Sequence, residues 1–370
     1  MSEKQRRLQP QGGSFIKNAV GAALVRLGSR SQEIEKDKER INRRVLPPDG
    51  DPHHFNDSFV FQGSADDGVM FMSRLGFRDD GSVAEVWVFL DLNGQKLVNT
   101  NTLLTLSTVS DTEVSAGGLS YVYQPDEDGW RITYDGPLDR AEHCSLDLMY
   151  RPSTRIYLSS EHMDPVSTGK AMAEMPWSRA YFQRLKSERQ VRMEQGGTIK
   201  GTVQVDGTEH RLDLKAFRDH SWGKRDWTFL NRYIWNILSL NKPLVLAGDE
   251  YTHFCYTTVD YGSSFKHLVS GWIAGPTSVL PIVASSDMNL LASDGMIPEK
   301  YDIVFRPKGL GPVTGQVHRL GAAHGWMLQG NDFEVNEAYC KLTIEGIEGQ
   351  GMSEFGFSRR CGIPRPCFVA

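Results

Sequence analysis

The sequence predicts an all-β protein made of two antiparallel lipocalin-like β-barrels or sandwiches in tandem, with helices only in an N-terminal arm and a linker. Runs of strand length, rich in β-branched and aromatic residues, follow one another from residue 55 onward. At 370 residues, the chain is long enough for two domains. Asp-Gly and Asn-Gly pairs, which favour the positive φ of tight hairpin turns, recur at 67–68, 80–81, 93–94, 128–129, 135–136, 206–207 and 294–295.

The N-terminal arm, residues 1–47, is predicted to be helical or disordered. Residues 1–45 hold eleven Lys/Arg and five Asp/Glu, a net charge of +6. Since the net charge of the whole chain is −5, the remaining residues carry a net charge of −11. "SFIKNAVGAALVRLG" predicts a short helix from an N-cap at Ser14 to Gly28, with an apolar stripe of Ile16, Val20, Ala23, Leu24 and Leu27. The arm packs loosely or stays mobile in one reading. The alternatives are membrane-surface contact through residues 14–28 and an organelle presequence.

The body divides near residue 195 in this reading. Residues 48–195 form a first β domain that ends in a linker with one helix, over "DPVSTGKAMAEMPWSRAYFQRLKSERQVRMEQ". Residues 196–370 form a second β domain, with strands in "GTIKGTVQVDGTEHRLDLKAF" and "YIWNILSL". Strands without helical crossovers exclude a parallel α/β fold, because parallel neighbours need long connections.

Composition and missing motifs narrow the function. An acidic body argues against nucleic acid as a partner, because binding phosphates requires a clustered basic face. The five scattered cysteines form no CxxC pair, so we expect neither a disulfide framework nor structural zinc, and an intracellular protein, cytoplasmic or peripheral to a membrane. The sequence has no GxxxxGK[ST], GxSxG or HExxH motif. Chemistry without a cofactor or metal, or simple binding, is therefore expected.

The densest polar stretch is "RLDLKAFRDHSWGKRDW", residues 211–227. Alternation along a strand puts Leu212, Leu214, Ala216, Arg218, His220 and Trp222 on one face, and Asp219 on the other. A face that changes from leucines to polar groups is typical of a ligand-cavity wall. Gly223 then permits a bend that re-aims Arg225, Asp226 and Trp227. The structural alternative is that the Arg-Asp pairs satisfy each other and that the histidine and tryptophans only pack.

Aromatic residues of the second domain give a weaker signal. Singly, each is more typical of a core, whereas together such rings could stabilise a carbocation; they are Tyr233, Trp235, Tyr256, Trp272 and Trp326. Glu354 lies in a predicted closing strand, where pairing with an arginine is the simpler role.

"RDHSWGKRDW" resembles the double lipocalin-like family that includes carotenoid 1,2-hydratase (hydroxyneurosporene synthase) and, more distantly, tocopherol cyclases and fungal Diels-Alderases. The stretches "MEQGGTIKGTVQVDG", "FNDSFVFQGSADDGVMFMSRLGFR" and "GMSEFGFSRR" fit the same pattern, so the resemblance spans about residues 53 to 360. It implies two lipocalin-like barrels or half-open sandwiches with a ligand cavity and no metal or redox cofactor.

The resemblance also implies a cofactor-independent hydratase, isomerase or cyclase acting on a hydrophobic small molecule, often an isoprenoid or polyketide. Asp219 or His220 would donate the proton. Because a neighbouring arginine favours an ionised aspartate, His220 is the predicted acid or base and Asp219 its structural partner. The implied ligand contacts are Arg218, Trp222, Arg225, Asp226, Trp227, Tyr233, Trp235 and Glu354. A carrier of a lipid-like ligand and a scaffold protein with a structural motif are the alternatives, and the oligomeric state stays open.

Overall fold

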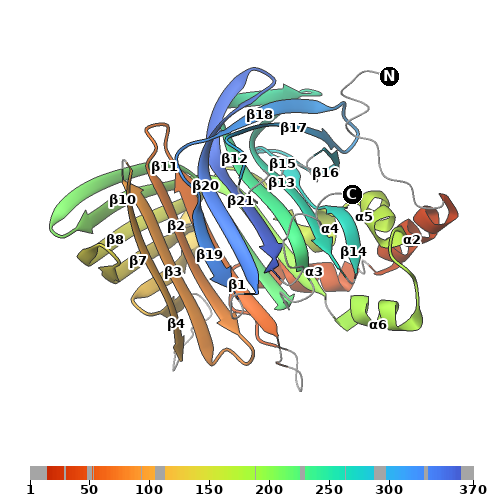
Figure 1. Cartoon of the computed structure of the whole chain (residues 1–370), viewed down its shortest axis with the longest axis horizontal. Coiled ribbons are helices and arrows are strands. Elements are labelled where there is room, and N and C mark those ends of the chain that lie inside the picture. Colours follow the sequence, from red (N-terminus) through yellow and green to blue (C-terminus); the bar gives the residue numbers. More distant parts are fainter. Residues whose placement is uncertain are drawn as a thin grey trace. The chain divides into compact units, whose positions relative to one another are not determined.

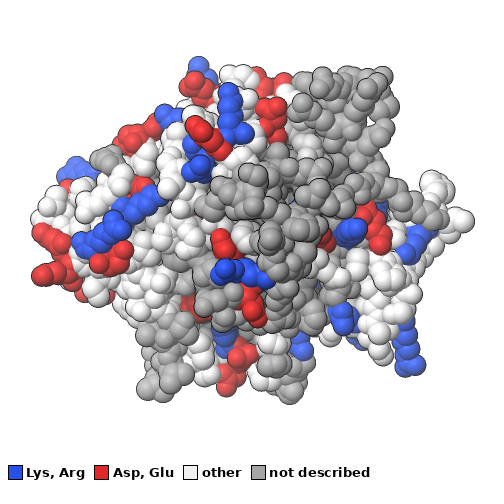
Figure 2. Space-filling model, viewed as in Figure 1, with Lys and Arg blue, Asp and Glu red and all other residues white. Residues whose placement is uncertain are grey.

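A computed structural model describes most of the chain, namely residues 15–28, 31–47, 52, 54–92, 94–104, 113–187, 189–225, 230–262, 264–286, 297–328 and 332–359. The chain splits into two compact units, each built around an antiparallel sheet (Figure 1). The sheet A unit comprises Gln32–Leu158 and Glu188–Arg225, and the sheet B unit comprises Met1–Ser31, Ser159–Ser187 and Asp226–Ala370. Acidic and basic side chains both lie on the face drawn in Figure 2.

Sheet A has eleven strands, in the order β4-β3-β2-β1-β11-β10-β8-β7-β6-β5, with β9 paired to β10. A short 3-10 helix, η1 (Pro125–Glu127), links β6 to β7. The strands are β1 (Phe55–Ser64), β2 (Met70–Arg78), β3 (Val83–Leu92), β4 (Gln95–Leu104), β5 (Glu113–Ala116), β6 (Leu119–Gln124), β7 (Gly129–Leu138), β8 (Ala141–Pro152), β9 (Tyr157–Leu158), β10 (Gln190–Val205) and β11 (Thr208–Lys224).

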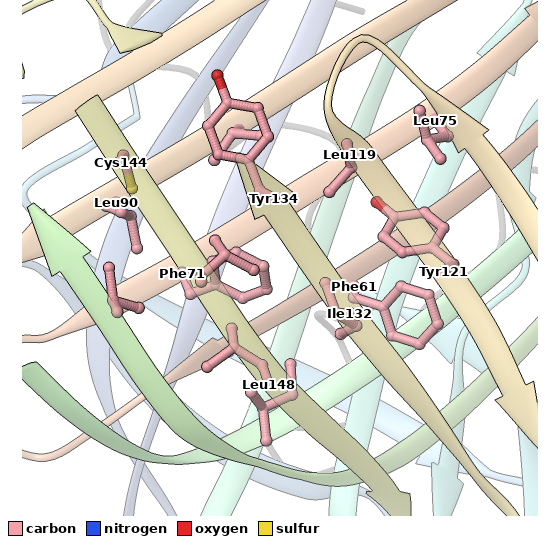
Figure 3. Close-up of a cluster of buried hydrophobic side chains, with 14 of the residues drawn as sticks. Phe61, Phe71, Leu75, Leu90, Leu119, Tyr121, Ile132, Tyr134, Cys144 and Leu148 are labelled. Atoms are coloured by element: carbon pink, nitrogen blue, oxygen red, sulfur yellow. The ribbon is translucent and has the colours of Figure 1, made fainter. Parts of the chain in front are cut away.

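The sheet curls around an apolar core rich in aromatic rings (Figure 3). The Phe61 ring meets Tyr121 edge-on at 4.8 Å and Tyr150 at 5.4 Å between centroids. The Tyr121 hydroxyl donates to Ser73 Oγ at 2.9 Å, which joins β6 to β2 across the core although these strands are far apart in the sheet. We call the side of the sheet turned to this core the interior face and the opposite side the outer face.

Sheet B closes on itself, because β12 pairs with β13 as well as with β21. Its order is β12-β21-β20-β18-β17-β16-β15-β13, with β14 attached to β13 and β19 to β20. A second apolar core fills this ring. The strands are β12 (Leu230–Leu246), β13 (Asp249–Tyr261), β14 (Phe265–Val269), β15 (Trp272–Ala274), β16 (Val279–Ser285), β17 (Lys300–Pro307), β18 (Val313–Arg319), β19 (His324–Leu328), β20 (Phe333–Ile344) and β21 (Ile347–Ser358).

Within the described residues, five α-helices accompany the sheets: α2 (Phe15–Gly28), α3 (Ser31–Arg40), α4 (Ser159–His162), α5 (Pro165–Ala173) and α6 (Arg179–Ser187). The α5 helix begins where Asp164 accepts hydrogen bonds from the backbone N–H groups of Val166 and Ser167. The helix predicted in the arm is present and ends at Gly28, whereas its predicted cap, Ser14, lies outside the described residues. No helix in the described ranges is both long and apolar enough to pass through a bilayer.

The predicted boundary near residue 195 is wrong. It falls inside β10, and β10 and β11 both belong to sheet A, where β11 pairs with β1 over Phe55↔Lys224 to Ser64↔Lys215. The predicted linker, residues 164–195, also differs: it contains two helices, α5 and α6, which group with the sheet B unit, and its last residues begin β10. Local sequence patterns cannot assign β10 and β11 to sheet A, because the strands of the two sheets are similar in composition. A pairing between distant strands also leaves no local signal.

Most predicted turns hold. Both Asp206 and Gly207 have positive φ, 47° and 83°, in the tight connection between β10 and β11. The pair at 135–136 is not a turn, because it lies within β7, next to a register shift between Gly136 and Leu138. The pair at 294–295 lies outside the described residues.

Candidate functional site

The polar motif lies on β11, between β1 and β10, and the strand's alternation divides it between two environments. Leu212, Leu214 and Ala216 join the core of sheet A. Arg218 and His220 continue the same face, opposite Phe61 and Phe59 of β1. Asp219 and Ser221 lie on the outer face, opposite Glu194 and Arg192 of β10. The predicted alternation is therefore observed, and it separates the two candidate acids.

His220 is completely buried on the interior face. Its Nε2 lies 2.8 Å from Oδ1 of Asp57, and its Nδ1 lies 3.2 Å from the carbonyl oxygen of Ile41. The imidazole stacks on Phe59 with 3.9 Å between ring centroids and 15° between planes. Both ring nitrogens thus contact acceptors of the protein itself. Because these partners and the Phe59 ring enclose the imidazole, the geometry favours a structural role.

Asp57 is the centre of this interior cluster and was not singled out in the sequence. Its Oδ2 accepts from Arg44 Nε at 2.6 Å and from the backbone N–H of Val45 at 3.1 Å. The Arg44 guanidinium also lies over the Phe77 ring, 3.4 Å from its centroid. Asp57 and His220 together therefore hold residues 41–45, the end of the basic arm, against β1 and β11.

Arg218 and Trp222 complete the interior half of the motif. Arg218 Nη1 donates to Asn42 Oδ1 at 2.8 Å, and its guanidinium lies 5.5 Å from the centroid of the Trp130 ring. Burial lowers the pKa of Arg218. Trp222 packs in a separate apolar cluster with Val45, Phe55, Leu158, Val191 and Met193. Both side chains bind the arm segment to the sheet instead of lining a wall that faces only a ligand.

Asp219 has a different environment on the outer face. Its carboxylate Oδ2 lies 3.5 Å from Arg192 Nε, and Arg192 Nη1 lies 3.5 Å from Glu194 Oε1. That same Oδ2 makes no hydrogen bond within the described part of the chain. Glu194 is directly opposite in the β10–β11 register, so two buried carboxyl groups share one arginine.

Burial raises the pKa of Asp219, although nearby Arg192 and Arg225 act in the opposite direction. The prediction that a neighbouring arginine would keep this carboxyl ionised is therefore reversed, because the desolvation of a side chain only 3% exposed outweighs the attraction. Asp219 is therefore the better candidate for a proton donor at this site, whereas the contacts of His220 favour a structural role.

A second carboxyl on the outer face shows the opposite shift. Glu85 Oε2 accepts from Arg74 Nη1 at 2.7 Å and from Arg78 Nη2 at 2.8 Å. Burial would raise the pKa of Glu85, but the two guanidinium groups outweigh it and hold this pKa at about 2. Glu85 therefore stays ionised, whereas burial shifts the pKa of Asp219 in the opposite direction.

The end of the motif turns away from β11. Gly223 has a φ of 119°, and an added Cβ there would meet the carbonyl oxygen of Arg189 at 2.3 Å, so the predicted bend needs glycine. Arg225 donates from Nη2 to Ser221 Oγ at 3.0 Å on the outer face. The predicted ligand contacts Asp226 and Trp227 lie outside the described residues.

The remaining predicted ligand contacts are in the other unit. Tyr233 donates its hydroxyl hydrogen to Glu354 Oε1, and its ring stacks on Phe333 at 5.8 Å between centroids. Trp235 Nε1 donates to Cys255 Sγ at 3.0 Å. These contacts lie within sheet B, whereas Arg218 to Arg225 belong to sheet A. Tyr256 and Trp272 are fully buried, as predicted for core residues.

In the described ranges, no group of three or more His, Cys, Asp or Glu side chains could hold a metal ion. The described cysteines, Cys144, Cys255 and Cys340, are buried, and they form no disulfide within the described part of the chain. Burial raises the pKa of Cys144 and of Cys340 to about 12, so neither is a ready nucleophile.

Comparisons with known proteins place the chain among structures of this fold. A family model described as a domain of unknown function (DUF7064) matches residues 41–358. An AttH-like protein from Nitrosomonas europaea has a TM-score of 0.54 at 12% identity, with 82% of this chain and 92% of that chain covered. CghA, solved with Sch210972, has a TM-score of 0.51 at 14% identity, with 86% and 94% covered.

Kievitone hydratase from Nectria haematococca gives a lower TM-score of 0.46 at 11% identity, over 82% of this chain and 89% of that one. A search of curated proteins gives no match. The likenesses to the AttH-like protein and CghA show a common fold, and with the two antiparallel sheets they confirm the predicted lipocalin-like class.

Proposed function

Because this chain belongs to the family described as a domain of unknown function (DUF7064), we propose its function from the chemistry of its own side chains. We propose a cofactor-independent enzyme of the hydratase, isomerase or cyclase type, in which Asp219 donates a proton to an unsaturated small molecule. One observation carries this proposal: Asp219 is a buried carboxyl whose raised pKa favours the protonated form. Buried carboxyls with a raised pKa are found among catalytic acids.

The proposed step needs no redox partner. The Asp219 carboxyl transfers its proton to one carbon of a double bond, and the π electrons form the new C–H bond and leave a cation on the other carbon. Water addition followed by proton loss completes hydration, and proton loss alone completes isomerisation. Attack by a second double bond forms a ring and a new cation, which loses a proton to complete ring closure. The Asp219 carboxylate left behind lies 3.5 Å from Arg192 Nε, which stabilises it until it is reprotonated.

The substrate class we propose is a hydrophobic molecule such as an isoprenoid or polyketide, which follows from the family resemblance of the motif. CghA shares the fold and has been solved with the small molecule Sch210972, which is compatible with a small-molecule ligand. A carrier would bind such a molecule equally well, but it would have no need for the raised pKa of Asp219.

A second role is favoured for the interior half of the motif. His220, Asp57 and Arg44 form a buried hydrogen-bonded cluster that attaches residues 41–45 to sheet A. We propose that this half is structural, so the scaffold alternative holds for His220 even if Asp219 is catalytic.

The experiment compares the wild type with Asp219→Asn after expression in a host rich in lipids and pigments. Asp213→Asn is the matched control, because Asp213 is on the same strand and face but exposed, and pairs with Lys200 at 2.8 Å. Mass spectrometry of a solvent extract of each purified protein should find unreacted molecules with Asp219→Asn, and hydrated, isomerised or cyclised counterparts with the other two. Loss of turnover by about a hundredfold or more is expected for a general acid.

A second measurement needs no substrate. The infrared spectrum of the wild type at neutral pH should contain a protonated-carboxyl band that Asp219→Asn lacks and Asp213→Asn retains. The same bound molecule in all three proteins would support a carrier. If the infrared band is also missing from the wild type, Asp219 is ionised and the proposed chemistry fails.

A further inference from the structure

Exposed apolar side chains are concentrated on the helices of the sheet B unit. Seven of the nine large apolar side chains that stand exposed in the described ranges belong to α2, α5 and α6. Phe15, Ile16 and Leu27 of α2 are 86%, 73% and 75% exposed. Large exposed apolar patches mark interaction sites more often than scattered single residues do.

The orientation of α2 explains why its apolar stripe is uncovered. The helix packs on α5 through small residues: a Cβ on Gly21 would meet the carbonyl oxygen of Gly169 at 2.6 Å, and one on Gly169 would meet Ala22 N at 2.3 Å. This contact uses the side of α2 that carries Gly21 and Ala22. The stripe predicted from the sequence, including Ile16, Val20 and Leu24, therefore points away from α5.

Contacts connect this stripe with exposed rings and side chains on the neighbouring helices. Lys17 donates to the carbonyl oxygen of Met175 and lies 5.0 Å from the centroid of the Trp177 ring. Trp177 in turn meets the Phe182 ring of α6 edge-on at 5.5 Å. Phe182 is exposed, and so is Val166 at the start of α5. The three helices thus present one apolar surface, which we call the helical surface.

The charges of the helical surface are all of one sign. Within their bounds, α2, α5 and α6 contain six basic residues and no acidic residue: Lys17, Arg26, Lys170, Arg179, Arg184 and Lys186. Figure 2 shows Lys and Arg side chains in the region of these helices, with acidic side chains also close by. The predominantly acidic composition of the rest of the chain makes this local excess of positive charge more pronounced.

We propose that the helical surface docks on the surface of a lipid bilayer that contains anionic headgroups. Exposed apolar side chains insert into the boundary between headgroups and acyl chains, while basic residues beside them attract anionic lipids. A second copy of this chain fits the surface less well, because a symmetric contact would bring the same cations together. This inference is independent of any chemistry at Asp219.

The test is flotation of the full chain with vesicles of phosphatidylcholine alone or with added phosphatidylserine. We expect the wild type to float with the phosphatidylserine vesicles, less in high salt, and weakly with phosphatidylcholine alone. Leu24→Ser with Leu27→Ser should lower vesicle affinity by roughly tenfold or more, since each leucine removed withdraws apolar area from the lipid. Arg179→Gln with Lys186→Gln should weaken binding to the anionic vesicles selectively.

Val245→Ser is the matched control, because Val245 is 60% exposed but lies on β12, outside the helical surface. It should float as the wild type does. The proposal is overturned if the wild type floats with neither vesicle, or if Val245→Ser loses as much binding as the leucine variant. It is also overturned if sedimentation shows a wild-type dimer that the leucine substitutions convert to monomer, which would identify a second copy as the occupant.

Discussion

The polar side chains on the two faces of β11 differ in their hydrogen-bond partners. On the interior face, His220 has a partner for each ring nitrogen and a ring stacked against it. On the outer face, Asp219 is equally hidden from solvent but lacks a hydrogen bond to Oδ2 among the described residues, and burial raises its pKa. Adjacent residues of one motif therefore have opposite energetic roles: one contributes stability, and the other costs stability.

The difference teaches that density of polar residues is not itself evidence of a site. A buried polar group with all its hydrogen bonds made rigidifies a fold, whereas a buried carboxyl with a raised pKa is a candidate for proton transfer. Substitutions on each face of β11 should therefore have different effects.

The largest expected effect is on stability at the interior face. His220→Ala removes the partner of Asp57 and the ring that stacks on Phe59, and it should lower the free energy of unfolding by about 3–5 kcal/mol. Urea denaturation at neutral pH, followed by circular dichroism, measures this. A loss below about 1 kcal/mol would mean that the interior cluster is not structural.

Asp219→Asn should change the free energy of unfolding in the opposite direction from His220→Ala. Since the folded pKa of Asp219 lies above its ordinary value of 3.8, the unfolded chain releases this proton before the folded chain does. The wild type therefore loses stability as the pH rises from about 3.8 through the folded pKa, and the asparagine variant does not. Denaturation at a series of pH values should show the variant gaining on the wild type as pH increases. A constant difference between them would contradict the raised pKa.

Glu85 is a second carboxyl on the outer face, and its pKa is shifted in the opposite direction from that of Asp219. Its pKa is held at about 2 against an ordinary 4.5, so its contribution is present above pH 4.5 and is lost as the pH falls toward 2. This contribution is roughly 2–3 kcal/mol. Glu85→Gln should remove that part of the acid sensitivity, measured as the slope of unfolding free energy against pH. Asp213→Asn, an exposed carboxyl in an exposed ion pair, should leave the slope nearly unchanged.

The smallest effect concerns the space that Arg74 occupies. A Cβ on Gly76 would meet Arg74 Nη2 at 2.4 Å, so Gly76→Ala should displace this guanidinium from Glu85. We expect a cost of about 1 kcal/mol, because Arg78 still pairs with Glu85 and the flexible arginine can move. The pKa of Glu85, followed by NMR, should rise with the substitution. An unchanged pKa would show that Arg78 alone holds this carboxylate.

Much of the fold follows from local patterns in the sequence. The Asp206-Gly207 turn and the alternation from Leu212 to Trp222 both depend on neighbouring residues, and both were predictable. The pairing of β1 with β11 joins segments far apart in the chain, and neither strand carries a local mark of its partner. That is why the predicted domain boundary near residue 195 was wrong.

The sequence placed the polar motif on one strand, but it could not supply the environment of each residue. Asp219 and His220 lie where the motif indicated, yet their environments come from Asp57, Ile41 and Arg192, which are distant in sequence or on another strand. Asp57 lies in the stretch "FNDSFVF", whose polar and apolar residues alternate as in many strands. The sign of a pKa shift depends on the balance of burial and charge in three dimensions, which no spacing rule supplies.

The way the sheets are joined also constrains how the chain can fold during synthesis. The first strand, β1, gains its second neighbour only after β11 has been synthesised. The ring of sheet B closes only after β21 can pair with β12. A nascent chain therefore exposes open strand edges on the ribosome until residue 224 for one sheet and until nearly the last strand for the other. High contact order of this kind slows folding, so we expect chaperone dependence to be greatest while sheet B is still incomplete.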